Sequence, residues 1–447
     1  MNFDIIKNEL IAEADKAGLS EYEIFFMESD GVSAETLKHE VSAFSSEMGG
    51  GICFRCVVDG HMGSASTEVF TKEEMKALVI RASENAKNIE SVDKAIIFEG
   101  SEKYENVVLP EIDNKSTADI KNMVLGLEEK IYGESEYIID GSCAYAYRSR
   151  TKFALINSKG LNLSNEVNSG GVFVQAVVQK DGESQESFCA EGSFSEEVIK
   201  DLPKKAVDEA LSKLGASTVA SGKYDLIFSG KQMRSLLSVF SSVFSGRSVL
   251  LGLSLLKGKE GEAIASEKVT LVDDPQRSGC PMQTPFDGEG VATYKKNVIE
   301  KGVLKTLLYD LSTADRVGVA STGNGQRSSY ADSVSIRPYS FYFEAGKLSK
   351  DELVATVKDG IYITALKGLH AGANSTTGDF SLDSEGFRIR DGKLCEYVKS
   401  FTVAGNFFDI LKNIEELSDK IDFALPSGFT IFGSPDVLVR QISVAGK

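Results

Sequence analysis

The apolar and polar positions of the N-terminal half follow the same order in two long stretches. The stretches GGGICFRCVVDG and SGGVFVQAVVQKDG each open with glycines, continue as an apolar strand and reach an Asp-Gly turn. In both, a polar strand and a helix follow, and the helix begins behind a hydroxyl residue, Thr71 in the first and Ser195 in the second. We therefore expect residues 52–58 and 172–178 to be equivalent strands of a duplicated unit.

An amphipathic helix is expected before each repeated stretch, over about residues 2–18 and 115–133. The pattern thus predicts two superimposable units, at about residues 1–95 and 115–215, in which helices cover one face of an antiparallel sheet. Together they form a duplicated helix and antiparallel-sheet domain over residues 1–220.

The C-terminal half has a different pattern. Small and polar residues in LGASTVASGKYD mark a boundary, and short strands with turn signals follow, as in EKVTLVDDP, FYFEAG and GFRIRDGKLCEYVKSFTVAG. Few helices are expected: an opening helix, one behind the capping pair Ser349 and Glu352, and one near residues 407–417. The pattern predicts a mainly antiparallel β domain, of barrel or sandwich type, over residues 221–447, and an α+β fold for the chain.

Composition narrows the classes of function. The 447 residues carry a net charge of −17, which repels phosphate backbones and anionic lipid, so neither nucleic acid nor a membrane is an expected partner. No apolar run reaches the roughly 18 residues of a spanning helix, and acids interrupt the apolar pattern of the first residues, unlike a signal peptide. The six scattered cysteines indicate reduced thiols, and we expect a cytoplasmic location.

Histidine and cysteine are scarce in this chain, and both are residues that could bind a metal. Cys53 and Cys56 form a Cys-x-x-Cys pair without a second pair of ligands, and a structural role is favoured. His39 and His61 lie beside strand and turn patterns and are expected to be structural. His370 lies in a loop rich in Gly, Ser and Thr, but without a paired carboxylate or cysteine a structural role is favoured there too.

The stretch RSLLSVFSSVFSGRS has apolar residues at helical spacing, so we expect the opening helix of the C-terminal domain to bury one face. Serines occupy its other face, among them Ser238, Ser241 and Ser242. A catalytic serine needs a base and an oxyanion hole, and neither a Gly-x-Ser-x-Gly elbow nor a Ser-x-x-Lys pair is present on this helix. A solvated or subunit-facing side is the favoured interpretation.

Two pairs of carboxylates could bind a cation. Asp273 and Asp274 lie in VDDP, and Asp287 and Glu289 lie in PFDGEG. Carboxylates suit cations, but Asp beside Pro or Gly is equally typical of a tight turn. Both interpretations stay open at this point.

The segments TLVDDP, TPFDGEGVATYKKNVIEKGVLKTLLYD, STGNGQR, TTGDFSLDSEGFRIRDGKL and VAGNFFDIL follow in this order. Their order resembles the TldD/PmbA family, once called modulators of DNA gyrase, over essentially the whole C-terminal half. The resemblance implies a cytosolic protease system of two homologous subunits, a metal-bearing TldD-like chain and a TldE-like (PmbA) chain. Such a system degrades unstructured peptides and matures certain precursor peptides.

The resemblance also implies a metal motif, His-Glu-x-x-x-His, on the helix after the first C-terminal strand of TldD-like chains. Those places fall here on Ser238, Val239 and Val243, which neither bind zinc nor move a proton. A further cysteine ligand corresponds to FALPSGF, which contains no cysteine. The chain is therefore expected to resemble the TldE/PmbA branch, without a metal of its own and with zinc in a TldD-like partner.

Two functions of different class follow from these expectations. The first is a non-catalytic subunit that pairs with the metal-bearing homologue and holds an extended, unstructured peptide. The second is a hydrolase in its own right, with a metal at Asp273, Asp274, Asp287, Glu289 or His370. Direct binding to gyrase or DNA ranks third because of the acidic balance. We expect a homodimer of the isolated chain and a heterodimer in the cell, with an interface of roughly 2,000 Å² or more.

The glycine-rich segments STGNGQR and HAGANSTTGDFS are expected to line an interior cavity or the subunit interface, because a peptide backbone can approach closely where side chains are small. The alternative is a set of tight turns with no ligand. The residues expected to contact peptide or partner are Asn324, Arg327, His370, Asn374, Ser375 and Asp379.

Overall fold

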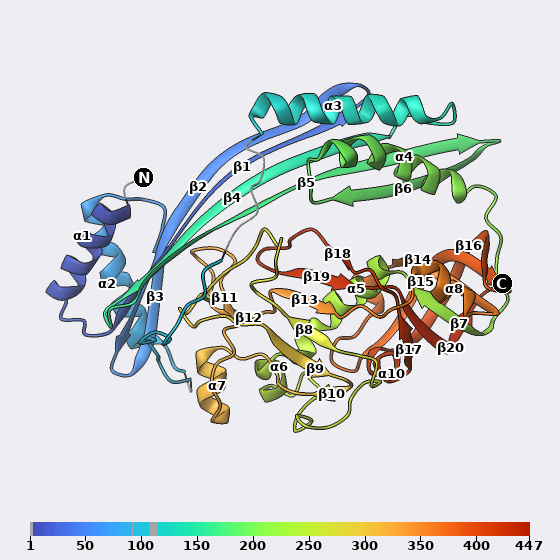
Figure 1. Cartoon of the computed structure of the whole chain (residues 1–447). Helices are drawn as coiled ribbons and strands as arrows, with labels where there is room; N and C mark the ends of the chain where they lie inside the picture. Colours follow the sequence, from blue (N-terminus) through green and yellow to red (C-terminus); the bar gives the residue numbers. More distant parts are fainter. Residues whose placement is uncertain (1–2, 92, 108–114) are drawn as a thin grey trace.

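A long curved sheet arches over a strand-rich C-terminal part (Figure 1). The structure is a computed structural model, and it describes residues 3–91, 93–107 and 115–447. Helices α1 and α2 lie at one end of the arch, and α3 and α4 cover its outer face towards the other end (Figure 1). The C-terminal part therefore lies against the inner, concave face.

The arch is a single antiparallel sheet of six strands in the order β3-β2-β1-β4-β5-β6. Its elements are α1 (Phe3–Lys16), β1 (Tyr22–Leu37), β2 (Glu40–Val58), β3 (His61–Thr67), α2 (Lys72–Asn88), α3 (Thr117–Glu134), β4 (Cys143–Asn157), β5 (Asn162–Lys180), β6 (Glu183–Glu191) and α4 (Glu196–Ser212). Each half has the order helix, three strands, helix. The two halves meet where β1 pairs with β4, so the predicted duplication is present.

Residues 52–58 and 172–178 occupy equivalent places in the two halves. Alternate side chains of the first stretch pack under α1 and α2, and those of the second pack under α3 and α4. Both stretches pair with the edge strand of their half, Ile52 opposite Thr67 and Val172 opposite Glu191. The Asp-Gly turns that follow have left-handed backbone, with φ of 52° at Asp59 and 50° at Asp181. This geometry is typical of a two-residue hairpin turn.

The alternation of side chains along β1 explains why the helices share one face of the sheet. Ile24 packs under α1 and α2, and Val32, an even number of residues further along, packs under α3 and α4. Phe25 points to the opposite face, into a core shared with Cys280 and Phe286 of the C-terminal part. The concave face is therefore the one that contacts the C-terminal part.

The C-terminal part contains two six-stranded sheets and a short two-stranded ribbon. Its strands are β7 (Gly222–Phe228), β8 (Leu271–Asp273), β9 (Lys296–Glu300), β10 (Val303–Leu304), β11 (Gly325–Gln326), β12 (Ser335–Ile336), β13 (Ser340–Phe343), β14 (Asp359–Lys367), β15 (Asp379–Arg390), β16 (Lys393–Asn406), β17 (Ile414–Leu417), β18 (Asp422–Phe423), β19 (Ile431–Ser434) and β20 (Val437–Ala445). The sheet orders are β10-β9-β8-β13-β19-β18 and β16-β15-β14-β7-β20-β17. An additional pairing of β16 with β20 closes five strands of the second sheet into a barrel.

The helices of this part are more numerous and shorter than expected. They are α5 (Gly230–Phe240), the 3-10 turn η1 (Ser241–Phe244), α6 (Gly246–Leu250), α7 (Leu311–Val317), α8 (Lys350–Ala355), α9 (Leu369–Gly372) and α10 (Phe407–Lys412). The reciprocal cap of Ser349 and Glu352 is present at α8. The helix expected over 407–417 is wrong in its second half: β17 forms there because Leu417 pairs with Val437, and tertiary pairing overrides the local pattern.

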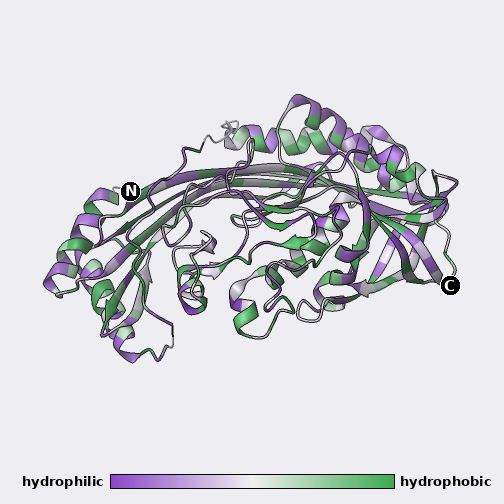
Figure 2. Cartoon of the chain, turned by 60° about the horizontal axis from the view of Figure 1, so that its bottom comes forward, coloured by the Kyte–Doolittle hydropathy of each residue, from purple (hydrophilic) through white to green (hydrophobic). Residues whose placement is uncertain are grey.

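Helices α1 to α4 each carry both polar and apolar residues (Figure 2). The largest core lies between the two C-terminal sheets and includes the buried face of α5. No helix within residues 3–91, 93–107 and 115–447 is long and apolar enough to cross a bilayer.

Candidate functional site

Helix α5 follows the barrel strand β7 and presents two chemically different faces. Its apolar residues Met233, Leu237 and Phe240 are fully buried in the core between the C-terminal sheets. After Phe240 the chain tightens into η1, where the Ser241 hydroxyl donates a 2.8 Å hydrogen bond to the carbonyl of Ser238. The buried face fixes the helix, and the serines are left on the side that borders a cavity.

This serine cavity has a volume of about 730 Å³. Its lining comes from α5 to α6, from Leu308 before α7, from the segment after β11, and from β19 with the loop before it. The lining residues are Ser238, Val239, Ser241, Ser242, Ser245, Arg247, Ser248, Leu251, Leu308, Ser333, Val334, Ser335, Ile336, Arg337, Pro338, Ser427, Thr430 and Phe432.

The two places where the resemblance implies lost metal ligands meet in the serine cavity. Ser238 and Val239 line it from α5, and Ser427, within the FALPSGF stretch, lines it from the loop before β19. Val243 differs, because it is completely buried in the core. In an unbroken α-helix residues 239 and 243 would share a face, whereas the 3-10 turn separates them.

The side chains at these places do not fit a zinc ion, because hydroxyl and alkyl groups replace the imidazole, carboxylate and thiolate ligands that zinc prefers. Within the described part of the chain, no three or more His, Cys, Asp or Glu side chains come together as a metal-binding group. Cys53 and Cys56 cannot act together either. They point to opposite faces of β2, Cys53 into the core beneath the arch and Cys56 into the core under α1 and α2.

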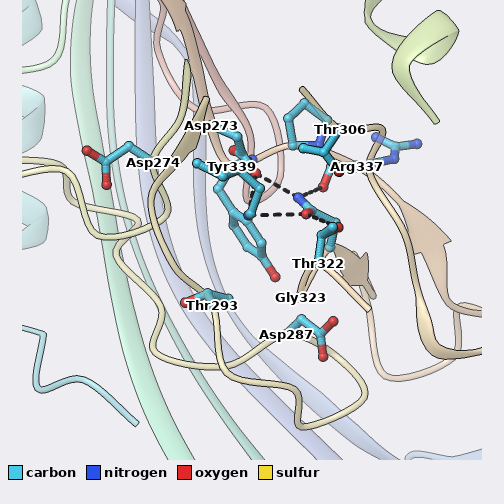
Figure 3. A network of polar contacts seen from close by, with 12 residues as sticks. Asp273, Asp274, Asp287, Thr293, Thr306, Thr322, Gly323, Arg337 and Tyr339 are labelled. Atoms are coloured by element: carbon cyan, nitrogen blue, oxygen red, sulfur yellow. Dashed lines mark hydrogen bonds and ion pairs between the residues drawn. The ribbon is translucent and has the colours of Figure 1, made fainter. Parts of the chain in front are cut away.

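Asp273 is the centre of a buried polar network instead of a cation ligand (Figure 3). Its Oδ2 accepts hydrogen bonds from Asn324 Nδ2 at 2.7 Å and from Lys296 Nζ at 3.2 Å. Its Oδ1 accepts one from the backbone N–H of Tyr339 at 2.7 Å. Asp274 points away from these groups (Figure 3). The carboxylate of Asp273 is thus fully used within the protein.

Asn324 fixes the backbone of Arg337 from two sides. The Asn324 amide donates to the Arg337 carbonyl at 3.0 Å, and the Arg337 N–H donates to the Asn324 carbonyl at 3.1 Å. The guanidinium of Arg337 points away from the network (Figure 3) and lines the serine cavity. Asn324, which the sequence singled out, therefore acts on the cavity indirectly, through a residue that the sequence did not single out.

Asp287 and Glu289 belong to a second buried cluster, at the contact between the arch and the C-terminal part. Burial raises the pKa of Asp287 to about 6, and burial together with the charge of Asp287 raises the pKa of Glu289 to about 8. Asp287 accepts hydrogen bonds from three backbone N–H groups, and Glu289 accepts one from Leu311 at 2.9 Å. These contacts are those of a structural turn.

Arg327 joins the two parts of the molecule within this cluster. It forms an ion pair with Glu23 of β1, and Arg55 of β2 binds the same carboxylate at 2.8 Å. The guanidinium of Arg327 also lies over the ring of Phe25, 4.6 Å from its centroid. Arg327 thus lies at an intramolecular contact and lines only a small cavity of about 20 Å³ beneath the arch.

The other four residues expected at the site lie elsewhere. His370, Asn374 and Asp379 are exposed, and Ser375 is half-buried. Asn374 accepts two backbone hydrogen bonds of its own turn, and Asp379 accepts one from Asn406 at 2.9 Å. The structure does not bring this loop together with Asn324 and Arg327, and none of these four loop residues lines the serine cavity.

A second cavity, of about 460 Å³, lies under the arch on the other side of the loop before β19. Leu425, Pro426 and Phe429 of that loop line it, whereas Ser427 and Thr430 line the serine cavity. The arch contributes hydroxyls and aromatic rings, among them Ser29, Thr151, Tyr145, Tyr147 and Phe173. One short loop therefore borders both cavities, with different residues on each side.

Three models of one known protein family match most of the chain, one after another. Residues 22–86 match PmbA/TldA metallopeptidase domain 1, residues 110–214 match the central domain, and residues 221–446 match the C-terminal domain. The chain belongs to the PmbA/TldD family.

Individual relatives agree with this assignment. A metalloprotease of Methanothermobacter thermautotrophicus is 31% identical over 313 residues, covering 66% of this chain and 67% of that protein. A metalloprotease of Methanocaldococcus jannaschii is 28% identical over 418 residues, covering 88% of both chains. A Thermotoga maritima protein described as a modulator of a DNA gyrase has a similar structure, with a TM-score of 0.89, 29% identity and coverage of 99% of this chain and 100% of that one. TldE from Thermococcus kodakarensis shares the fold with a TM-score of 0.87 at 24% identity, over 99% of this chain and 100% of that one.

Proposed function

We propose that this chain is a TldE-like, non-catalytic subunit of a peptide-degrading metalloprotease whose zinc lies in a homologous TldD-like partner. The serine cavity carries the proposal. It has about 730 Å³ of space at the helix where the resemblance implies a metal, but its lining offers hydroxyl, alkyl and guanidinium groups. Neither a zinc ligand nor a general base is among them.

The names of relatives support the part of the proposal that places zinc in a homologous TldD-like partner. Relatives in Saccharolobus solfataricus and Haemophilus influenzae are described as a zinc metalloprotease TldD homologue and a metalloprotease TldD homologue. In this proposal the present chain holds an unstructured peptide that the partner cleaves. The six cysteines, none of which forms a disulfide, support a cytoplasmic location.

Exposed leucines beside the serine cavity support a partner surface in the C-terminal part. Leu250, Leu251, Leu253 and Leu255, here called the leucine patch, are 36 to 60% exposed, and Leu251 also lines the cavity. Apolar patches of this kind mark protein contacts. In the proposal the leucine patch contacts the homologous partner, or a second copy when the chain is alone, because two-fold contacts are the commonest solution for oligomers.

Co-expression with a homologue that carries His-Glu-x-x-x-His tests the proposal. We expect the two chains to co-purify, zinc to follow the homologue, and an unstructured peptide to be cleaved by the complex but not by this chain alone. The control is the same complex with glutamine in place of the homologue's motif glutamate, which should assemble and fail to cleave. Zinc-dependent cleavage by this chain alone, or failure of the pair to assemble, would refute the proposal.

The leucine patch has a separate test. Sedimentation of the isolated chain at micromolar concentration should show a dimer, and replacing Leu251 and Leu253 with aspartate should give a monomer. Replacing the exposed Ile80 of α2, which lies in the N-terminal part, with aspartate is the matched control and should leave the dimer intact. A monomer without any substitution would remove the self-association.

A further inference from the structure

The charges that line the serine cavity are of one sign. Of the 447 residues, 66 are Asp or Glu, but none of the described residues lining the cavity is an acid. Two arginines, Arg247 and Arg337, line it together with eight serines and one threonine. In a chain with a net charge of −17, this cavity is a local site of positive potential.

The two arginines differ in how far their charge is already compensated. Arg247 forms an ion pair at 3.6 Å with Asp93, which also pairs with Arg316 at 3.0 Å, so the charge of Arg247 is partly compensated. Arg337 is exposed and forms no ion pair with any residue that the structure describes. The cavity therefore contains one guanidinium that is available to an incoming anion.

Asn324 holds the backbone of Arg337 in place through two hydrogen bonds. One joins the two main chains, and the other runs from the side-chain amide of Asn324 to the carbonyl of Arg337. Asn324 itself is completely buried and is fixed by Asp273, Lys296 and Thr322. The arginine thus projects from a rigid base, which lowers the ordering cost when its guanidinium binds a ligand. A planar guanidinium matches the two oxygens of a carboxylate in a bidentate pair.

Hydroxyl donors lie in the same cavity. The hydroxyls of Ser238 and Ser242 make no hydrogen bond to other residues in the described part of the chain, whereas that of Ser241 is used by the helix. A volume of about 730 Å³ is within the range of roughly 300–1,000 Å³ typical of ligand sites.

We propose that the serine cavity binds a carboxylate of the peptide, with Arg337 as the main contact and Ser238 and Ser242 as hydroxyl donors. This inference rests on the proposed function, since it takes the ligand to be the unstructured peptide. The carboxylate comes either from the C-terminus of the peptide or from an acidic side chain. In both cases the cavity anchors the peptide by its charge, at the helix where the resemblance implies a metal in TldD-like chains.

The test is fluorescence anisotropy of short, unstructured peptides labelled at the N-terminus, titrated with the full-length chain. The three probes have the same sequence without acids and a free C-terminus, the same sequence with a C-terminal amide, and the amide form with one internal glutamate. We expect the free acid to bind about tenfold more tightly than the amide, which corresponds to one charge-assisted contact. The preference should weaken as salt increases, because an exposed pair is screened.

Variants of the two arginines show which residue causes the preference for the free acid. Arg337→Gln should reduce the preference for the free acid to less than about twofold, and Arg337→Lys should retain part of it, since lysine keeps the charge but not the bidentate geometry. Arg247→Gln is the matched control and should keep the preference, because Asp93 already partly compensates Arg247. Thermal unfolding should be the same for all three.

Each outcome has one meaning. If the internal glutamate restores the affinity of the amide, the site accepts a side-chain carboxylate; if it does not, the site selects the terminus. Equal binding of acid and amide, or a preference that survives Arg337→Gln, overturns this inference and leaves the proposed function intact. Binding of no probe overturns the inference and also contradicts the proposed handling of peptides by this chain.

Discussion

The two buried polar clusters, around Asp273 and beneath the arch, differ in the balance of their acidic and basic groups. Around Asp273 one carboxylate faces one ammonium, that of Lys296, and amide and backbone groups complete the contacts. The cluster beneath the arch has more acids than bases: Asp287, Glu289 and Glu23 against Arg55 and Arg327. The first cluster pairs one carboxylate with one ammonium. In the second, burial raises the pKa values of Asp287 and Glu289, and the charge of Asp287 raises that of Glu289 further.

The difference follows from what each cluster connects. The Asp273 network joins β8 to Lys296 of β9, to Asn324 just before β11 and to Tyr339 just before β13, all within the C-terminal part. The second cluster joins that part to β1 and β2 of the arch. We therefore infer that one cluster sets the local geometry next to the serine cavity, and that the other makes the contact with the arch sensitive to pH.

The largest expected effect is on the balanced cluster. Asp273→Ala leaves the ammonium of Lys296, whose side chain is 4% exposed, without its counter-charge. Removing one partner of a buried pair costs about 3–5 kcal/mol in the free energy of unfolding. Urea unfolding measures this loss, and the double variant Asp273→Ala with Lys296→Met should regain part of it. A single variant within about 1 kcal/mol of the parent contradicts the balanced-pair interpretation.

A smaller effect is expected for the contact with the arch. Arg327→Met keeps an apolar stem over Phe25 but removes one of the two guanidinium groups on Glu23. Since Arg55 stays bound to the same carboxylate, the loss should be about 1.5–3 kcal/mol by urea unfolding. Arg390→Met, which removes an exposed pair with Glu396, is the control and should leave the free energy of unfolding nearly unchanged. Equal losses in both variants would contradict a special role for the contact with the arch.

The raised pKa values of Asp287 and Glu289, which are caused mainly by burial, set the direction of the pH dependence. Because the folded-state pKa values of Asp287 and Glu289 are raised to about 6 and about 8, their contribution to stability is fully present below the ordinary values of 3.8 and 4.5 and is lost as pH rises through the raised values. Glu289→Gln should remove most of this decline and be more stable than the parent at pH 8, by on the order of 1 kcal/mol. The measurement is the unfolding free energy at a series of pH values between about 5 and 8. A parent that becomes more stable over this interval relative to the variant would show that the sign is wrong.

The smallest effect is expected in the loop that the sequence grouped with Asn324 and Arg327. His370→Ala removes an exposed side chain and should change the free energy of unfolding by less than about 0.5 kcal/mol. If the loop contacts peptide or partner, as expected from its glycines, the variant will lower affinity in a complex without a change in stability. A loss of stability comparable to that of Arg327→Met would place the loop among the structural clusters.

Sequence patterns predicted those features of the fold that depend on residues close together in the chain. The duplicated strands, the helix at α5 and the cap formed by Ser349 and Glu352 depend on alternation, spacing and adjacent donors, and all three are present. The strand at β17 was missed because its pairing with Val437 involves residues outside any local window.

The candidate site was predicted less well, because its residues meet only through the fold. Arg327 and Glu23 are 304 positions apart, and no pattern in either segment identifies the other. Arg337 lies in the short stretch SIRPYS, which reads as an ordinary strand end. An arginine is available to bind an anion only if no neighbouring carboxylate already pairs with it. The positions of those carboxylates are known only from the folded structure.

The duplicated arch has a consequence for the rate and fidelity of folding. Within each half, strands neighbouring in sequence form hairpins, which close quickly because their contacts are local. The seam between the halves is not local: the hydroxyls of Ser29 and Thr151 on β1 and β4 meet across 122 positions of sequence. Each half can thus complete its hairpins before the seam forms, while the exposed edge of β1 is free to pair with β4 of another molecule. Exchange of halves between two chains is accordingly the misassembly expected when this protein refolds at high concentration.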